Sequence, residues 1–250
     1  MSETRGVLYG VGVGPGDPDL ITIKAIKILR EAEVIFAASS INNSHSLAVE
    51  IARPHLSGHQ DIRVLQFQMS HNEAGREALW EQNSQVIIEE IEQGKKVAFL
   101  TLGDPMTYST FGYLIRTIHG VKPAVSIVTI PGITSYQAAA ARINTPLVEG
   151  DESLLITSGV RGGAQVRKFM EQAENIVLLK TYKNISDINE ALLDGGLIGN
   201  CVGISKCGRE GETIVADVRE CKGWKPDYWT LYIAKKNRKI NISRKEHSTE

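Results

Sequence analysis

Short apolar runs alternate along the first half of the chain with segments in which apolar residues recur at helical spacing. The runs are rich in Val, Ile and other residues favoured in strands, and each ends at glycine or polar positions. They cover residues 6–13, 34–38, 62–67, 96–102 and 124–130. Because strands alternating with helices are typical of βα units, the pattern predicts an α/β fold with a mainly parallel sheet.

The apolar residues at helical spacing predict two helices in this half, over 20–31 and 73–93. Asp19 is expected to cap the first helix by accepting a backbone N–H, and Gly94 is expected to end the second. The positions expected on the buried faces are Leu20, Ile23, Ile26 and Leu29 in the first helix and Trp80, Val86, Ile87 and Ile91 in the second. A further helix is expected to begin near Phe111.

The second half repeats the alternation after an interruption at 142–152, where Pro146 and Gly150 break the periodicity. The expected strands are 153–158, 175–182, 201–206, 212–217 and 228–236, with helices near 163–173 and 184–193. Connections between the last three strands are too short for a parallel crossover, so these strands should pair antiparallel. We therefore expect an N-terminal α/β domain over 1–145, a C-terminal α/β domain over 151–236, and a polar, disordered tail over 237–250.

Composition and charge exclude several classes of protein. Among 250 residues, 28 Lys and Arg nearly balance 29 Asp and Glu, so no global basic field favours nucleic acid. The chain shows no signal-peptide pattern at its start and no apolar run of about 18 residues, so a soluble, cytoplasmic protein without membrane contact is expected. Three cysteines without a Cys-x-x-Cys pair suit a reducing compartment. The histidines show no zinc-ligand spacing, so no protein-bound metal is expected.

Three glycine-bearing loops, 12–19, 102–110 and 131–141, follow strands of the first half and lead into helices. Ligands of open α/β sheets bind beyond the carboxyl ends of strands, where backbone amides at helix N-termini point toward them. The spacing excludes a dinucleotide fingerprint, because Pro15 or Asp17 stands where its third glycine is needed. No Gly-Lys-Ser/Thr follows the loop either. The loops therefore predict a site for a ligand that is not a polyphosphate.

The ordered set "GVGPGD", "GDP", "PGITS", "VLLK" and "GREGE" resembles the tetrapyrrole methylases, a family of S-adenosyl-L-methionine-dependent C-methyltransferases. The resemblance implies two α/β domains, with a mainly parallel N-terminal sheet, a mixed C-terminal sheet and a cofactor trough between them. The segments "VAFLTLGDPMTYST" and "IPGITSYQAAAARINTPL" are most similar to the branch that methylates carbon 20 of precorrin-2 or cobalt-factor II in cobalamin biosynthesis. Relatives that methylate uroporphyrinogen carry a doubled glycine where this chain has Leu102-Gly103.

The resemblance also implies which residues surround the cofactor. These are Pro15, Leu102, Gly103, Asp104, Thr107, Ser109, Thr134, Ser135, Lys180, Thr181, Tyr182 and Gly208. Asp104 either accepts from the cofactor's ribose hydroxyls or amino group, or serves only to form the turn before Pro105. Ser109 either faces the ligand or caps the helix that follows. The base that removes the proton from the methylated carbon is Asp104, Tyr108 or a water molecule.

A tetrapyrrole acceptor carries several carboxylates, so cations are expected around it. The candidates are Lys24, Arg53, Arg116, Arg161 and Arg209. Any cobalt is expected in the substrate and not in the protein. The resemblance implies a homodimer, for which residues 41–56 and the helix over 73–93 offer apolar positions that look exposed. The alternatives are a same-fold methylase acting at another corrin carbon, on ribosomal RNA or on diphthine, and a non-catalytic nucleotide-binding module.

Overall fold

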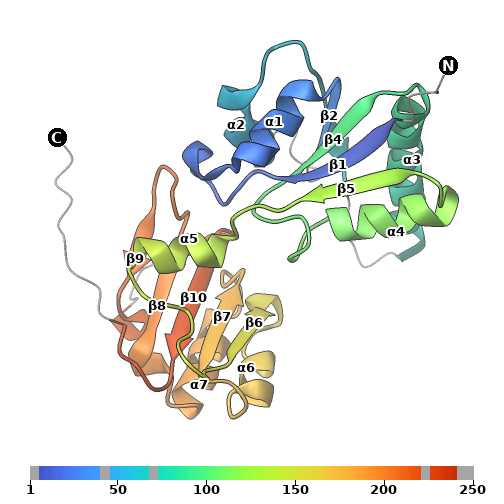
Figure 1. The fold of residues 1–250 in the computed structure, drawn as a ribbon. Helices are drawn as coiled ribbons and strands as arrows, with labels where there is room; N and C mark the ends of the chain where they lie inside the picture. The colour runs from blue at the N-terminus through green and yellow to red at the C-terminus, as the bar shows by residue number, and fades with distance from the viewer. Residues whose placement is uncertain (1–5, 40–45, 68–72, 221–225, 241–250) are drawn as a thin grey trace. The chain divides into compact units, whose positions relative to one another are not determined.

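The computed structural model describes residues 6–39, 46–67, 73–220 and 226–240, and it divides into two compact units, Met1–Thr134 and Ser135–Glu250 (Figure 1). Each unit contains one β-sheet with helices, so the predicted α/β class is confirmed. The domain limits 1–145 and 151–236 stay a prediction. Of the predicted tail, residues 241–250 lie outside the described residues. No helix within the described ranges has the length and apolar character needed to cross a bilayer.

The sheet of the first unit is entirely parallel. Its strands are β1 (Val7–Gly12), β2 (Val34–Ser39), β3 (Asp61–Gln66), β4 (Lys96–Thr101) and β5 (Ser126–Ile130), in the order β3-β2-β4-β1-β5. All five lie within one or two residues of the predicted runs. Because β1 lies between β4 and β5, the loops that follow these three strands emerge side by side at one edge of the sheet.

Helices cover both faces of this sheet (Figure 1). The helices are α1 (Ile23–Glu31), α2 (Leu47–Ala52), α3 (Glu73–Glu92) and α4 (Phe111–Val121), with a 3₁₀ turn, η2, at Arg53–His55. Alternate strand residues point to opposite faces, so Val11 packs in the cluster that contains α1 and α2, while Leu8 and Phe99 pack with α3 and α4. The result is a helix–sheet–helix sandwich with a separate apolar core on each side of the sheet.

The start of the first helix differs from the prediction. A 3₁₀ turn, η1 (Pro18–Leu20), precedes α1, and Asp17 caps that turn by accepting from the Asp19 amide at 2.9 Å. Thr22 caps α1, accepting from the Ala25 amide at 3.1 Å, so the assignment of Asp19 as cap was wrong. Ile23 is 73% exposed, because positions three apart turn back about 60° per step and soon leave a single helical face.

The long helix α3 follows the prediction closely. Trp80, Ile87 and Ile91 are buried, and Val86 is partly buried. Gly94, two residues after the end of α3, has a φ of +81°, which does not continue a helix. Most of the described large apolar side chains of α2 and α3 pack inside the first unit, while Leu79 stays partly exposed. None of those described within 46–56 and 73–93 is among the exposed large apolar residues, so these segments are less exposed than expected, and residues 41–45 lie outside the described ranges.

The sheet of the second unit is mixed. Its strands are β6 (Leu154–Ser158), β7 (Asn175–Leu179), β8 (Cys201–Ser205), β9 (Thr213–Val215) and β10 (Thr230–Lys235), in the order β6-β7-β10-β8-β9. Strands β6 and β7 are parallel, whereas β10 pairs antiparallel with both β7 and β8, and β8 pairs antiparallel with β9. The predicted antiparallel pairing of the last three strands is confirmed.

The part of the second unit that the structure describes also contains three helices and three 3₁₀ turns: α5 (Ser135–Arg142), α6 (Ala164–Phe169), α7 (Ile185–Asp194), η3 (Gly159–Arg161), η4 (Ile198–Asn200) and η5 (Val218–Glu220). Val166 of α6 and Ile188 of α7 pack on Leu178 and Tyr232 of the sheet. Helix α5 packs against β10 and belongs to the second unit.

A buried lysine ties the segment before β6 to this sheet. Lys235 of β10 is 1% exposed, and its Nζ donates to the Pro146 carbonyl at 2.7 Å and lies 3.8 Å from Glu152 Oε2. Glu152 also accepts from Asn175 Nδ2 at 3.0 Å and pairs with Arg238 at 3.1 Å. The interruption that marked 142–152 in the sequence is therefore an ordered, hydrogen-bonded segment.

Candidate functional site

Backbone hydrogen bonds join the loops that follow β1 and β4. The Gly103 amide donates to the Gly14 carbonyl at 2.7 Å, and the Gly14 amide donates back to Gly103 at 3.3 Å. One residue earlier, the Val13 amide donates to the Thr101 carbonyl at 3.0 Å. The first two predicted ligand loops therefore form one unit beyond the carboxyl edge of the sheet.

The third loop joins the other two through close backbone contact. A Cβ at Gly12 would lie 2.6 Å from the Gly103 carbonyl oxygen, and a Cβ at Gly132 would lie 2.2 Å from the same oxygen. Any side chain at either position would therefore collide with backbone. Glycine is needed at these two positions because the loop backbones approach one another closely. This contact explains both glycines whether or not a ligand is bound. Gly103 itself has a φ of +69°, a conformation that favours glycine.

Asp104 adds a side-chain link between the second and third loops. Its Oδ2 accepts from the Gly132 amide at 3.0 Å, and its Oδ1 accepts from the Met106 amide at 2.8 Å. Thr107 Oγ1 lies 3.5 Å from the same Oδ1. The turn-forming role considered for Asp104 is therefore present, and it extends to holding a neighbouring loop. A carboxylate oxygen with one hydrogen bond can still accept a second one.

The residues after Met106 lead into α4. Ser109 Oγ accepts from the Phe111 amide at 3.1 Å, so its capping role is present. Tyr108 adopts a φ of +50° and is 54% exposed. A non-glycine residue in the left-handed region is uncommon, and such residues cluster at functional sites. The left-handed conformation and the exposed ring together make Tyr108 a candidate ligand contact.

The predicted site residues of the first unit come together at this edge. They are Pro15, Leu102, Gly103, Asp104, Thr107, Ser109 and Thr134. Pro15 and Thr134 are buried, and a Cβ on Gly103 would lie 3.9 Å from Thr134 Cα. Ser135, the next residue, begins α5 in the second unit.

Apart from Ser135, the predicted site residues of the second unit follow β7 and β8. Lys180 follows β7 with a φ of +59°, and Gly208 follows β8 with a φ of +73°. The Thr181 amide donates to the Thr230 carbonyl at 3.0 Å, and its side chain is fully buried. The surface at this strand end is therefore formed by Lys180 and Tyr182, which are both partly exposed.

Two aromatic residues that sequence analysis did not single out also lie here. Tyr228 packs edge-on against Tyr182, with ring centroids 5.4 Å apart, and Trp229 packs against Tyr228 at 5.0 Å. The sequence pattern predicts only that they begin the strand over 228–236. The signal available in the sequence was a pair of adjacent aromatic residues before the alternating part of that strand.

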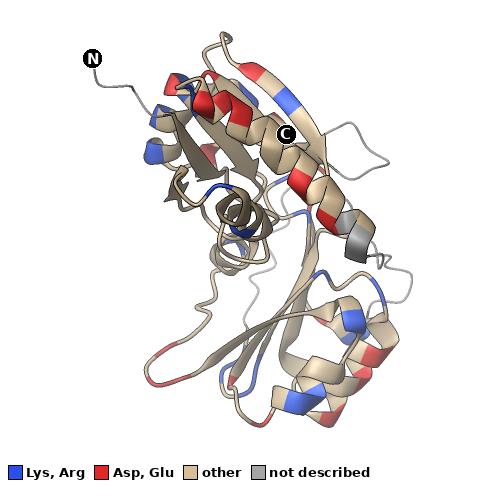
Figure 2. Ribbon diagram, turned by 90° about the vertical axis from the view of Figure 1, so that its right-hand side faces the viewer, with Lys and Arg blue, Asp and Glu red and all other residues tan. Residues whose placement is uncertain are grey.

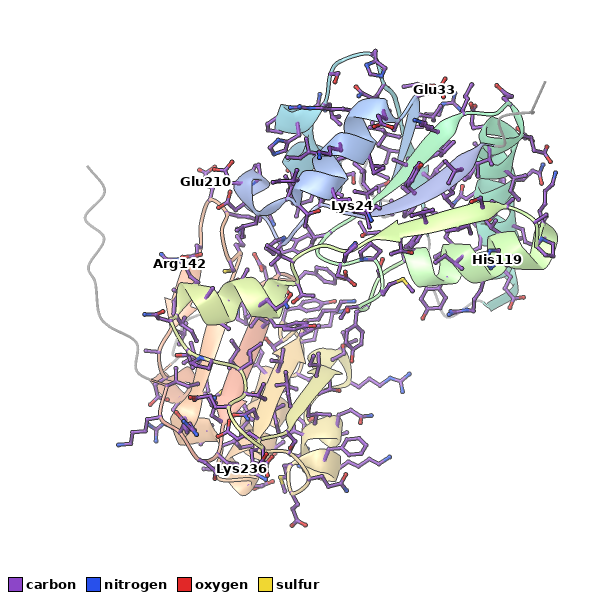
Figure 3. All side chains as sticks on the ribbon, in the orientation of Figure 1. Lys24, Glu33, His119, Arg142, Glu210 and Lys236 are labelled. Carbon is purple, nitrogen blue, oxygen red and sulfur yellow. The ribbon has the colours of Figure 1, made fainter. Side chains whose placement is uncertain are left out.

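The five candidate cations differ in their surroundings. Lys24, which Figure 3 labels on α1, is exposed. Arg53, Arg116 and Arg161 are exposed as well. Arg209 is partly buried, and its guanidinium carbon lies 5.3 Å from the centre of the Trp229 ring. In Figure 2, Lys and Arg residues are interspersed with Asp and Glu on the helices of the second unit.

The described cysteines lie inside the second unit. Cys201 and Cys207 are buried free thiols, and Cys221 lies outside the described residues. Burial, with a smaller contribution from Glu212, raises the pKa of Cys207 to about 11, so the thiol stays protonated at neutral pH. Within the described ranges, no group of three or more His, Cys, Asp or Glu side chains is placed to hold a metal ion.

Comparison with known proteins assigns the family. The family model of the Tetrapyrrole (Corrin/Porphyrin) Methylases matches residues 7–221. The cobalt-precorrin-2 C(20)-methyltransferase of Salmonella typhimurium is 33% identical over 233 residues, covering 93% of this chain and 97% of that protein. The probable cobalt-precorrin-2 C(20)-methyltransferase of Methanocaldococcus jannaschii is 35% identical over 187 residues, covering 75% of this chain and 77% of that protein.

The fold is shared with a solved member of this group. Uroporphyrin-III C-methyl transferase from Thermus thermophilus, solved in complex with S-adenyl homocysteine, superposes with a TM-score of 0.68 at 22% identity, over 92% of each chain. The family model extends from β1 to the residues that follow β9, and β10 lies beyond its end. The chain therefore belongs to the tetrapyrrole (corrin/porphyrin) methylase family and is a methyltransferase.

Proposed function

We propose that the protein transfers a methyl group from S-adenosyl-L-methionine to carbon 20 of a precorrin-2-type tetrapyrrole in cobalamin biosynthesis. The observation that carries this proposal is the 33% identity to a cobalt-precorrin-2 C(20)-methyltransferase over 97% of that protein's length. Both relatives are named for a cobalt-bearing acceptor, so the cobalt form is the proposed acceptor. The cobalt then enters as part of the substrate.

The loops of the first unit fit the proposed methyl donor. Their backbones are locked together at Gly14 and Gly103, and Asp104 holds Gly132 beside them, so amides and short side chains are presented in a preorganised arrangement. The relative solved with S-adenyl homocysteine supports a site of this kind. We therefore propose that the donor contacts Pro15, Leu102, Gly103, Asp104, Thr107, Ser109, Thr134, Ser135, Lys180, Thr181, Tyr182 and Gly208.

When bound, S-adenosyl-L-methionine supplies a methyl group already activated on a sulfonium. The sulfur–methyl bond breaks as the carbon–carbon bond forms, and the bonding electrons of the former remain on sulfur. The chain's contribution is alignment, because a correctly oriented pair of reactants needs little further catalysis. Asp104 keeps the loops in place, and the exposed ring of Tyr108 lies on the same loop to contact the acceptor. The proton displaced at carbon 20 leaves to Asp104, Tyr108 or water.

The test is mass spectrometry of the products formed with S-adenosyl-L-methionine whose methyl is labelled with carbon-13. Under anaerobic conditions the protein is offered cobalt-factor II or metal-free precorrin-2 in separate reactions. We expect one labelled methyl on the cobalt-bearing acceptor, located at carbon 20 by carbon-13 NMR. Labelling at another carbon supports a same-fold methylase of different position, and no transfer to either tetrapyrrole contradicts the proposal.

We further propose that the protein is cytoplasmic and acts as a homodimer. The two buried free thiols, Cys201 and Cys207, are consistent with a reducing compartment. The dimer is proposed from the family resemblance alone, since most of the large apolar side chains of α2 and α3 that first suggested it pack inside the first unit.

A further inference from the structure

A histidine side chain holds the segment that follows β1. The loop over residues 12–17 leads into the 3₁₀ turn η1, and its Pro15 is one of the proposed donor contacts. His55 lies in η2, directly after α2 and 37 residues beyond η1 along the chain. Because α1 and α2 pack on the same face of the first sheet (Figure 1), the two 3₁₀ turns next to these helices come within hydrogen-bond distance of each other.

The contact is made at the Pro18 carbonyl. His55 Nε2 lies 3.0 Å from this oxygen, and the Ile21 amide donates to the same oxygen at 3.3 Å. A carbonyl oxygen only accepts hydrogen bonds, so His55 Nε2 carries the hydrogen, and the two donors use both lone pairs of the oxygen. The bond from Ile21 closes η1 on itself, whereas the bond from His55 ties η1 to a distant part of the chain.

The start of α1 does not depend on the histidine for its capping. Asp17 caps η1 by accepting from the Asp19 amide, and Thr22 caps α1 by accepting from the Ala25 amide. The bond from His55 therefore satisfies no backbone group that would otherwise lack a partner. What it adds is a fixed position for η1 relative to η2.

The turn that His55 holds lies directly against the loop after β1. A Cβ at Gly14 would lie 3.1 Å from the Leu20 carbonyl oxygen, so the end of η1 packs on the backbone of Gly14. Gly14 in turn exchanges two backbone hydrogen bonds with Gly103, in the loop after β4. A connected series of contacts thus runs from His55 through η1 to two of the three glycine loops.

The histidine is itself held in place. Its ring is partly buried, and its carbonyl accepts from Arg30 Nε of α1 at 3.4 Å. The next residue, Leu56, packs against the apolar core that α1 and α2 share. The imidazole therefore projects from a segment that is fixed to the same core as α1.

We propose that His55 is a positioning residue for the methyl donor, because its hydrogen bond to Pro18 keeps the loop after β1 in the arrangement that the donor binds. This inference rests on the proposed function and adds to it a residue that acts through Pro18 and Gly14. Without the bond, a smaller fraction of the molecules has the loop in that arrangement. The apparent affinity for the donor falls in proportion to this fraction.

The inference is tested by calorimetric titration of S-adenosylhomocysteine into the full-length protein, which requires no acceptor. His55→Leu should weaken binding about fivefold, which corresponds to the loss of one ordinary hydrogen bond. His55→Gln should restore most of the affinity, because a glutamine amide donates to a carbonyl from a nitrogen placed much as imidazole Nε2 is.

Gln60→Leu is the matched control. Gln60 is also partly buried, and its Nε2 donates to the Leu29 carbonyl at 3.0 Å. This bond resembles that of His55 in kind, but it reaches the C-terminal end of α1 and not η1. We expect His55→Leu and Gln60→Leu to lower the urea midpoint of the ligand-free protein to a similar extent, whereas only His55→Leu binds S-adenosylhomocysteine more weakly.

Kinetics give a second readout, in which the donor KM of His55→Leu rises about fivefold while kcat stays within about twofold of wild type. Wild-type affinity in His55→Leu, an equal loss of affinity in Gln60→Leu, or no recovery in His55→Gln overturns the inference. A wild-type protein that does not bind S-adenosylhomocysteine contradicts both this inference and the proposed function. If the variants bind as expected but no tetrapyrrole is methylated, the proposed function fails while the positioning role of His55 stands.

Discussion

Asp104 is the residue whose side chain joins two of the glycine loops, and this structural role separates it from a simple ligand contact. Asp104→Ala removes acceptors from the Gly132 and Met106 amides and should lower the free energy of unfolding of the ligand-free protein by about 1–3 kcal/mol. S-adenosylhomocysteine affinity should fall as well. The measurements are urea denaturation and calorimetry, with the exposed Asp19→Ala as control. Unchanged stability of the ligand-free variant would contradict the linking role.

Gly132 offers a second test at the residue scale. In Gly132→Ala the new Cβ would lie 2.2 Å from a backbone oxygen, so one loop must move, and we expect a loss of about 1–3 kcal/mol in stability together with weaker donor binding. Gly112→Ala is the matched control, because no atom lies within 4 Å of the added Cβ and α4 gains a better helix former. If the two variants proved equally stable, the close packing of the loops would be contradicted.

At the scale of elements, Glu90 connects α3 to the sheet. Its carboxylate accepts from Arg63 of β3 at 2.6 Å and from Lys95, just before β4, at 2.5 Å. The hydrogen bond from Lys95 is the largest cause that lowers the pKa of Glu90, and the hydrogen bond from Arg63 lowers it further. Together they hold this pKa below its ordinary value, although burial acts in the opposite direction. A lowered pKa in the folded state means that this stabilisation is present above the unfolded pKa, about 4.3, and is lost as pH falls through the folded pKa.

Glu90→Gln should therefore destabilise the protein at neutral pH and flatten the dependence of unfolding free energy on pH below about pH 5. The measurement is urea denaturation at several values between about pH 3 and pH 7. Glu89→Gln makes the same charge change at an exposed position of the same helix and should leave the profile nearly as in wild type. An identical pH profile for Glu90→Gln and wild type would show that the cluster contributes no linkage.

Lys235 is the corresponding tether in the second unit, where it holds the segment before β6. Lys235→Met fills a similar volume but leaves the Pro146 carbonyl without its donor, so stability should fall by about 1–3 kcal/mol. Lys236→Met, at the exposed neighbour seen in Figure 3, should change stability by less than about 0.5 kcal/mol. Denaturation curves in which both variants matched wild type would contradict the tether.

At the scale of the whole molecule, the proposed homodimer is open to direct measurement. Light scattering at micromolar concentration should give a mass of twice 27.4 kDa, and a dilution series should show whether the mass falls. A species of 27.4 kDa that keeps full methyl-transfer activity would rule out an obligate dimer. Dimer interfaces need a complementary apolar surface. Because most large apolar side chains of α2 and α3 are packed inside the first unit, we do not expect these helices to supply that surface.

The sequence alone predicted the succession of strands and helices along the chain and the parallel or antiparallel character of their pairing. The family motifs could be read in it directly. Periodicity and loop length are local properties, so runs such as 96–102 and 124–130 specify strands wherever they pack. The glycine loops were equally visible, and the topology rule for parallel strands brought them to one edge. Boundaries at helix starts were less predictable, since Asp17, Asp19 and Thr22 all carry capping side chains and only the folded chain shows which amides they reach.

Only the tertiary structure decided which residues that are distant in the sequence come into contact. The sequence predicted a ligand site at the glycine loops, whereas at Gly12 and Gly132 the backbone of a neighbouring loop is what makes the close approach. It could not show that Asp104 reaches across to Gly132, or that Lys180, Arg209 and Trp229 gather at one sheet end, because each contact joins residues far apart in the chain. Spacing along a sequence encodes local conformation, but contacts between distant residues depend on how strands are ordered in the sheet.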